Sequence, residues 1–191
     1  MKVHFIGSMT DLENNIGAFR AIVDTIKKSG AKLTREWVEG AYSTSQINDE
    51  DDIETVWPKI YRENKEAVSR ADVIIAEISN RSFLVGFQVA YALQMKKPVL
   101  LLSNHNRTRG AIGLSENEEI IKFSRYDSTN LEAIIVNFIN ENSSANKDLR
   151  FNFFIDRKIL NYLNWASFQT GDTKSEIIRN ILKNEIDKSE F

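Results

Sequence analysis

One segment of this 191-residue chain constrains its fold more than any other. Residues Val73–Ile78 form a nearly unbroken apolar run, which is followed by the polar loop Ser79–Ser82 and then by a helix that opens around Gly86. An apolar strand without polar alternation suits a parallel sheet that is buried on both faces. A strand, a short loop and a helix in this order predict one unit of an α/β fold.

The first 142 residues repeat this alternation of strands and helices. The predicted strands are Val3–Ile6, Lys32–Glu36, Val73–Ile78, Pro98–Leu102 and Ile120–Arg125, and the predicted helices are Leu12–Lys28, Ile53–Ser69, Phe83–Met95 and Leu131–Ile139. This order predicts a doubly wound, flavodoxin- or Rossmann-like parallel sheet of five strands. Such sheets bind ligands at the carboxyl ends of their strands. That rim would carry Gly7–Ser8, Ser79–Ser82 and Ser103–Gly113.

Composition excludes several classes of site. The chain has no cysteine, which rules out disulfides, thiolate metal sites and a cysteine nucleophile. With only His4 and His105, we expect no metal and no cofactor. A net charge of -2 gives no general attraction to nucleic acids or anionic membranes. The chain enters a strand pattern at once and has no run of roughly 18–20 apolar residues, so we expect a cytoplasmic protein without a membrane partner.

The pattern changes after a polar linker predicted at 143–149. Residues 150–191 form the second predicted domain: a strand at Arg150–Ile155, a helix at Arg157–Gln169 that stops at Gly171, and a last amphipathic helix. Some forty residues with so much apolar surface do not make a stable core alone. A strand without an internal partner therefore predicts pairing with a second copy.

The segment Ala71–Leu93 resembles the nucleoside 2-deoxyribosyltransferase family and its relatives that hydrolyse deoxynucleoside monophosphates. In that family a nucleophilic glutamate follows the glycine and the aromatic residue that open this helix. The glycine and the aromatic are Gly86 and Phe87 here, and the next residue is Gln88. An amide cannot attack an anomeric carbon as a carboxylate does. The resemblance thus implies the family's fold, with its reactive group replaced.

Two more catalytic positions of the family are changed, while the surrounding residues are kept. By ungapped counting, the family's helper aspartate falls on Asn64 and its first-strand tyrosine falls on His4. The resemblance implies a pocket that binds a nucleoside or nucleotide through residues that are retained, namely Gly7, Ser8, Ser82 and Gly86. Both carboxylates become neutral amides, so the pocket would keep its shape and lose its chemistry.

Each of these residues also has an ordinary structural interpretation. Gln88 is an acceptable polar residue at a helix start, and Asn64 is acceptable on the solvated side of a helix. His4 on an apolar strand is more often a core histidine than a ligand, and Ser82 is a good helix cap.

A displaced carboxylate would restore the chemistry. Glu63, Glu66 and Glu77 lie near the changed positions in sequence, and Glu77 ends an apolar strand. Arg107 and Arg109 follow the fourth strand and would either meet a phosphate or remain solvated.

Residues Arg150 to about Ile186 resemble the ribbon-helix-helix family of dimeric DNA-binding modules. The resemblance implies base contacts from Arg150, Asn152 and Phe154 and phosphate contacts from Thr173, Lys174 and Ser175. Against DNA binding, residues 148–191 hold seven Lys or Arg and seven Asp or Glu. Affinity for DNA depends largely on neutralised phosphates. The alternative is a unit that only dimerises the chain.

Three functions follow from these patterns. The first is a homodimeric or tetrameric transcriptional regulator that senses a nucleotide or nucleoside in a catalytically inactive pocket and binds double-stranded DNA. The second is an active nucleoside or nucleotide N-glycosidase or deoxyribosyltransferase with a dimerising or DNA-targeting tail. The third is an antitoxin-like partner of another chain.

Overall fold

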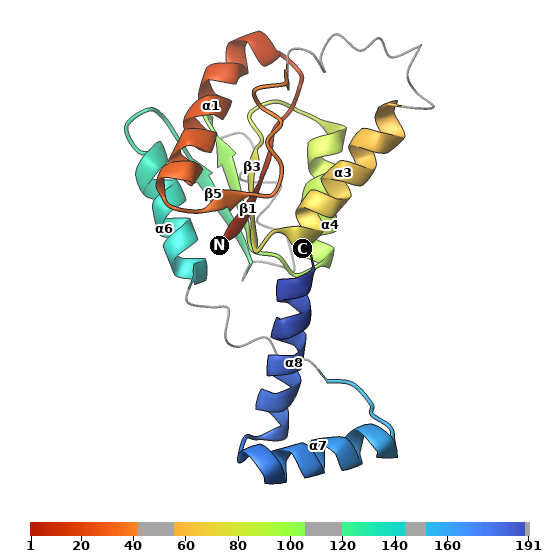
Figure 1. Ribbon diagram of the computed structural model, residues 1–191. Coiled ribbons are helices and arrows are strands. Elements are labelled where there is room, and N and C mark those ends of the chain that lie inside the picture. Colours follow the sequence, from red (N-terminus) through yellow and green to blue (C-terminus); the bar gives the residue numbers. More distant parts are fainter. Residues whose placement is uncertain (42–55, 106–119, 144–151, 190–191) are drawn as a thin grey trace. The chain divides into compact units, whose positions relative to one another are not determined.

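The structure is a computed structural model that describes residues 1–41, 56–105, 120–143 and 152–189. The chain divides into two compact units, Met1–Lys147 and Asp148–Phe191, and each is described by itself (Figure 1).

The first unit contains the predicted parallel sheet. Its strands are β1 (Lys2–Ile6), β2 (Lys32–Leu33), β3 (Val73–Glu77), β4 (Val99–Ser103) and β5 (Ile121–Arg125). They lie in the order β2-β1-β3-β4-β5, and all neighbours are parallel. The prediction of a five-stranded, doubly wound sheet is confirmed. The order reverses direction at β1, so the loops after β1 and β3 flank the position where such folds bind ligands.

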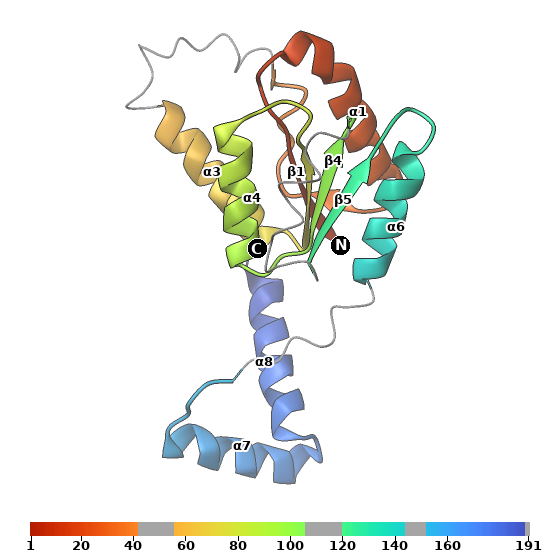
Figure 2. The ribbon, with the colours of Figure 1, turned by 180° about the vertical axis from the view of Figure 1, so that it is seen from behind.

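Helices cover both faces of this sheet. One face carries α1 (Leu12–Lys28) and α6 (Leu131–Ser143), and the other carries α3 (Val56–Arg70) and α4 (Phe83–Gln94) (Figures 1 and 2). Successive strand side chains point to opposite faces. Accordingly, Val73 and Ile75 pack in the core on the α1–α6 face, while Ile74 and Ala76 pack on the α3–α4 face. Both layers are apolar, which is why β3 reads as a continuous hydrophobic run.

A close approach fixes one residue of the predicted rim. A Cβ added to Gly7 would lie 3.1 Å from the Phe19 ring and 3.2 Å from the Trp37 ring. The Trp37 indole stacks on Phe5 at 5.6 Å and donates a hydrogen bond to the Phe5 carbonyl oxygen. Packing on the α1 side of the sheet therefore disfavours a larger residue at Gly7, independently of any ligand.

The second unit contains two helices, α7 (Arg157–Thr170) and α8 (Lys174–Lys188), as predicted. Gly171 joins them with a φ of 79°, in the left-handed region that favours glycine. The strand predicted at Arg150–Ile155 is not formed over residues 152–155, and Arg150 lies outside the described residues. A strand needs a partner for its backbone groups, and the described part of the chain supplies none. The ribbon-helix-helix arrangement therefore stays a prediction.

Among the helices that the structure describes, none is both long enough and apolar enough to span a membrane.

Candidate functional site

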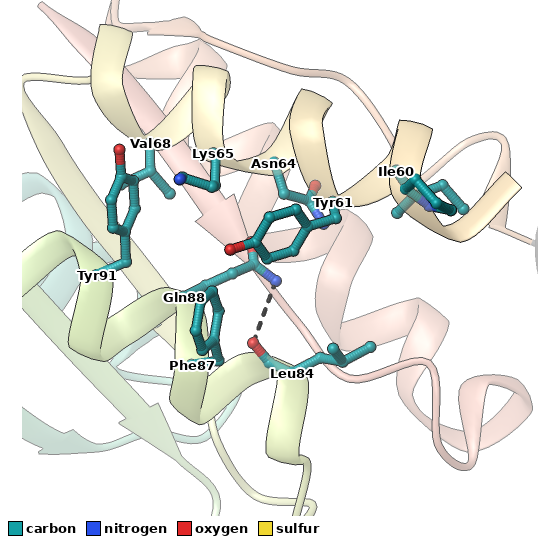
Figure 3. Close-up of a pocket in the computed structure, with 10 residues that line it drawn as sticks. Ile60, Tyr61, Asn64, Lys65, Val68, Leu84, Phe87, Gln88 and Tyr91 are labelled. Atoms are coloured by element: carbon teal, nitrogen blue, oxygen red, sulfur yellow. Dashed lines mark hydrogen bonds between the residues drawn. The ribbon is translucent and has the colours of Figure 1, made fainter. Parts of the chain in front are cut away.

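A cavity of about 720 Å³ lies between α3 and α4 (Figure 3). Its volume is within the range of small-molecule sites. Each helix contributes four side chains at positions i, i+3, i+4 and i+7, and α3 also contributes Pro58 and Ile60. The eight are Tyr61, Asn64, Lys65 and Val68 of α3 and Leu84, Phe87, Gln88 and Tyr91 of α4. This spacing turns one stripe of each helix toward the other.

The two amides that the resemblance places at the family's catalytic positions both line this cavity. Asn64 and Gln88 both line it, and Figure 3 shows them projecting from facing helices. The Gln88 Nε2 donates to the Leu84 carbonyl oxygen at 3.4 Å, and the Asn64 Oδ1 accepts from Arg35. These bonds leave the Gln88 oxygen and the Asn64 NH2 for other partners. Sequence reasoning placed this pair together, and the structure does so too.

Arg35 ties two adjacent residues of α3 to the loop after β2. Its Nη1 donates to Asn64, and its Nη2 pairs with the Glu63 carboxylate at 2.6 Å. Because the two acceptors bind the two Nη atoms of one guanidinium, the Glu63 carboxylate is held beside Asn64. The Arg35 side chain is 25% exposed and that of Glu63 is 40% exposed, so the ion pair is partly shielded from water.

His4 is buried on the same face of the sheet. Its neighbour Ile6, two residues along β1, belongs to the core on the α3–α4 side, so His4 points that way as well. Neither ring nitrogen finds a hydrogen-bond partner within normal distance among the described residues. Burial lowers the pKa of His4 to about 4; the Gln88 side chain raises it and the Arg35 charge lowers it further. His4 is therefore neutral at pH 7.

The three candidate replacement carboxylates lie in different surroundings. Glu77 points to the same face of the sheet as Val73 and Ile75, because side chains alternate along β3. This is the α1–α6 face, away from the cavity. Its Oε1 accepts from the Ser79 hydroxyl and, at 3.1 Å, from the Tyr126 hydroxyl. Burial and the neighbouring Glu77 charge raise the pKa of Tyr126.

Glu66 pairs with Arg70 at 3.1 Å on the outer surface of α3, with 60% of its side chain exposed. Glu63 does not line the cavity itself, but it shares the Arg35 guanidinium with Asn64, which does.

The predicted ligand-binding residues of the rim lie where expected but do not line this cavity. Ser8 is buried after β1 and accepts from the Thr10 amide at 3.1 Å, and Ser82 caps α4 by accepting from the Val85 amide at 3.4 Å. Each hydroxyl therefore keeps its own proton to donate. A Cβ at Gly86 would meet no heavy atom of the described residues within 4 Å, so the start of α4 is open. Arg107 and Arg109 lie outside the described residues.

Sequence reasoning missed Arg35, Tyr61, Lys65 and Tyr91. Lys65 lies with its Nζ 5.0 Å from the centroid of the Tyr91 ring and 5.6 Å from that of Tyr61. The repeated i, i+3, i+4, i+7 spacing around Asn64 and Gln88 is the signal that would have found three of them. Arg35 has no such signal, because only the folded sheet brings the end of β2 to α3.

In the second unit, the predicted DNA contacts are exposed but poorly suited to phosphate. Asn152 and Phe154 are exposed. Thr173 forms a capping box with Glu176: its hydroxyl and its amide donate to the Glu176 carboxylate at 2.7 and 2.9 Å. These hydrogen bonds lower the pKa of Glu176. A carboxylate therefore occupies the helix start at which a DNA phosphate was predicted, next to Lys174 and Ser175.

Comparisons with known proteins relate the chain to nucleotide-cleaving enzymes. No protein-family model matches it. A Methanosarcina barkeri (strain Fusaro / DSM 804) protein named as a 2'-deoxynucleoside 5'-phosphate N-hydrolase is 24% identical over 139 residues, which are 72% of this chain and 84% of the relative. The 5-hydroxymethyl-dUMP N-hydrolase of Esox lucius is 29% identical over 102 residues, 53% of this chain and 68% of the relative.

A solved structure of CMP N-glycosidase from Clostridium botulinum aligns with a TM-score of 0.45 and 12% identity, covering 74% of this chain and 99% of that one.

The curated relatives support a nucleoside 2-deoxyribosyltransferase-like domain in this chain. They also correct the first functional prediction. The interpretation as a DNA-binding transcriptional regulator is wrong, because both relatives are named as N-hydrolases of nucleotides, and the enzyme alternative agrees with them. The balanced charge of residues 148–191 and the carboxylate at the start of α8 agree with this correction.

Proposed function

We propose that this chain is a nucleotide N-glycosidase that hydrolyses the bond between base and sugar in a nucleoside 5'-monophosphate. One observation carries the proposal: a single guanidinium, that of Arg35, holds the Glu63 carboxylate beside Asn64, which lines the cavity together with Gln88. The Glu63 carboxylate thus stands next to Asn64, one of the two amides of the cavity. The names of the curated relatives support the reaction and the substrate class.

The reaction needs no covalent intermediate on the protein. A water oxygen bonds to the anomeric carbon, the bond to the base nitrogen breaks, and the base leaves with the electron pair. Glu63 accepts the proton that the water loses. Its negative charge also stabilises the positive charge that develops on the sugar in the transition state. Asn64 and Gln88 bind the sugar through hydrogen bonds.

The rim residues complete the proposed substrate site. The hydroxyls of Ser8 and Ser82 each have a proton to donate, and Ser82 stands at the start of α4, where a helix favours an anion. We propose that they bind the phosphate, with Gly86 leaving room for it. Loss of nucleotide affinity in Ser82→Ala, with nucleoside affinity unchanged, is the expected result.

The test is release of free base from a panel of ribo- and deoxynucleoside 5'-monophosphates, followed by mass spectrometry. The wild type is expected to release base from at least one of them. Glu63→Gln should lower the rate by about 10²–10⁴, the usual contribution of a general base. Glu66→Gln is the matched control on the same helix, since it removes a carboxylate whose partner is Arg70 on the surface. No release from any substrate, or equal rates in Glu63→Gln and wild type, would contradict the proposal.

We propose further that the second unit joins two copies of the chain. Its buried core consists of Leu163, Ala166 and Ile177. Its large apolar side chains are mostly exposed, and examples are Phe154, Phe168, Trp165 and Leu182. A core this small does not stabilise a unit of some forty residues alone, so the exposed side chains need a partner.

A second copy would also offer a pairing strand for residues near Phe154. Light scattering should therefore give a dimer or a higher oligomer, and Phe154→Ser with Phe168→Ser should shift it toward the monomer. A wild-type monomer at micromolar concentration would refute this part.

A further inference from the structure

Lys65 lines the cavity between α3 and α4, and the reaction proposed above gives it no role. Lys65 lies between the rings of Tyr61 and Tyr91, and none of the described carboxylates pairs with it. Figure 3 shows its side chain next to Asn64 on the wall that faces α4. An ammonium group between aromatic rings is stabilised by their faces and keeps its N–H donors for a ligand.

The rest of the cavity suits a flat aromatic group. Tyr61 and Phe87 lie 5.5 Å apart between ring centroids, on facing helices, and are 44% and 37% exposed. Together with Leu84 and Val68 they form an apolar wall on both sides of the two amides. Aromatic side chains bind nucleobases by stacking, whatever the base. A sugar phosphate, by contrast, would gain little from this wall.

A base that leaves in N-glycoside hydrolysis carries off the electron pair of the broken bond. The base must be protonated, or its negative charge stabilised, as the bond breaks. Asn64 cannot supply that proton, because an amide is not an acid at neutral pH. Lys65 is the next residue, it lines the same cavity, and its N–H groups carry positive charge.

We propose that this cavity holds the base of the nucleotide and that the Lys65 ammonium donates a proton to the leaving base. This rests on the proposed function and assigns its missing acid. Lys65 loses one proton to the base nitrogen, and Glu63 gains one from the attacking water. Exchange of these two protons with solvent restores both side chains, so the net reaction consumes one water and releases the neutral base.

The experiment compares leaving groups of different acidity in the full chain. Base release is measured from dUMP and from 5-fluoro-dUMP for the wild type, Lys65→Met, Lys65→Arg and the control Lys59→Met. Lys59 is an exposed lysine on the same helix and does not line the cavity. Lys65→Met should lower kcat for dUMP by about 10²–10⁴, the usual contribution of a general acid. The loss should be at least about tenfold smaller for 5-fluoro-dUMP, because fluorouracil stabilises its own anion and depends less on a proton donor.

Lys65→Arg should be about as slow on dUMP as Lys65→Met, because a guanidinium keeps its protons, and Lys59→Met should equal the wild type. A structural role for Lys65 would slow both substrates equally, and that result would overturn the proposal. Wild-type release of base with an unchanged Lys65→Met rate would overturn the Lys65 assignment and leave the proposed function standing. Wild-type failure on every nucleotide would remove both.

Discussion

The two faces of the sheet differ in how completely they are packed. On the α1–α6 face, a continuous core extends from Val3 to Ile139 and includes the buried aromatic residues Phe5 and Phe19. On the α3–α4 face, the core is smaller, and the space between the helices is a cavity of about 720 Å³ bordered by half-exposed aromatic side chains. One face therefore stabilises the fold, and the other has room for a ligand.

The largest effect is expected from the truncation of one aromatic residue on each face. Phe19 is fully buried, and truncation of a buried phenylalanine costs about 3–5 kcal/mol. Phe19→Ala should lower the free energy of unfolding in urea by this amount. Phe87→Ala should cost well under half of that and should weaken nucleotide binding instead. Equal losses of stability in the two variants would mean that the cavity wall belongs to the stabilising core.

The pH dependence of stability tests the one buried histidine. The pKa of His4 is about 4 in the folded chain and 6.5 without burial, so the unfolded chain binds a proton more readily. Stability is therefore complete above pH 6.5 and falls as the pH drops from 6.5 to 4, by about 3 kcal/mol in total. His4→Phe should remove this component, so that its urea midpoint falls less between pH 7 and pH 4.5 than that of the wild type. Parallel pH profiles would contradict the assignment.

A smaller effect is expected at Gly7. A methyl group there would lie 3.1–3.2 Å from the Phe19 and Trp37 rings, and both rings belong to the packed α1–α6 side. Gly7→Ala should therefore cost about 1–3 kcal/mol, which is the usual range for an overpacked core. Gly86→Ala is the matched variant, since a Cβ there meets no described heavy atom, and it should leave the unfolding midpoint nearly unchanged. The reverse order of the two variants would refute the packing argument.

The smallest effect concerns the solvent side of α3. Glu66 and Arg70 form an exposed pair, and such pairs contribute about 0–1 kcal/mol. Glu66→Gln should shift the thermal midpoint by no more than a few degrees and should leave base release unchanged. A loss of base release in this variant would move the catalytic carboxylate from Glu63 to Glu66.

Much of the fold could be predicted because its signals are local. The apolar runs around Val73–Ile78 and Pro98–Leu102 correspond to β3 and β4, and the helical stripe of Leu12–Lys28 corresponds to α1. The second strand was predicted longer than Lys32–Leu33, since a short edge strand leaves little apolar signal. The strand at Arg150–Ile155 is not formed over its described residues, because strand formation depends on a partner that lies outside the local sequence.

The site could be predicted only in part, for a related reason. Counting along the sequence placed Asn64 and Gln88 in one site, and both line the cavity. The alternation of side chains along β3 would have predicted that Glu77 points away from the cavity, since Val73 and Ile75 lie on the same side and pack under α1 and α6. Arg35 depends on the sheet order, which brings the end of β2 to α3, and no sequence spacing records that contact.

The prediction of a DNA-binding regulator was wrong, and it was based largely on two neutral amides in the pocket. Gln88 and Asn64 indicated a lost nucleophile, which favoured a sensor over an enzyme. The structure holds a third group beside Asn64, the Glu63 carboxylate, through an ion pair that the sequence does not reveal. The equal numbers of acidic and basic residues in 148–191 already argued against DNA binding by the second unit, because affinity for DNA depends largely on neutralised phosphates.

Hydrolysis by this protein is tested most directly by a mass-spectrometric search for free base after the wild type is incubated with nucleoside 5'-monophosphates. We expect base from at least one nucleotide, and the same reaction with Glu63→Gln should be slower by about 10²–10⁴. Binding of these nucleotides without release of any base would contradict the claim that the face between α3 and α4 carries out hydrolysis.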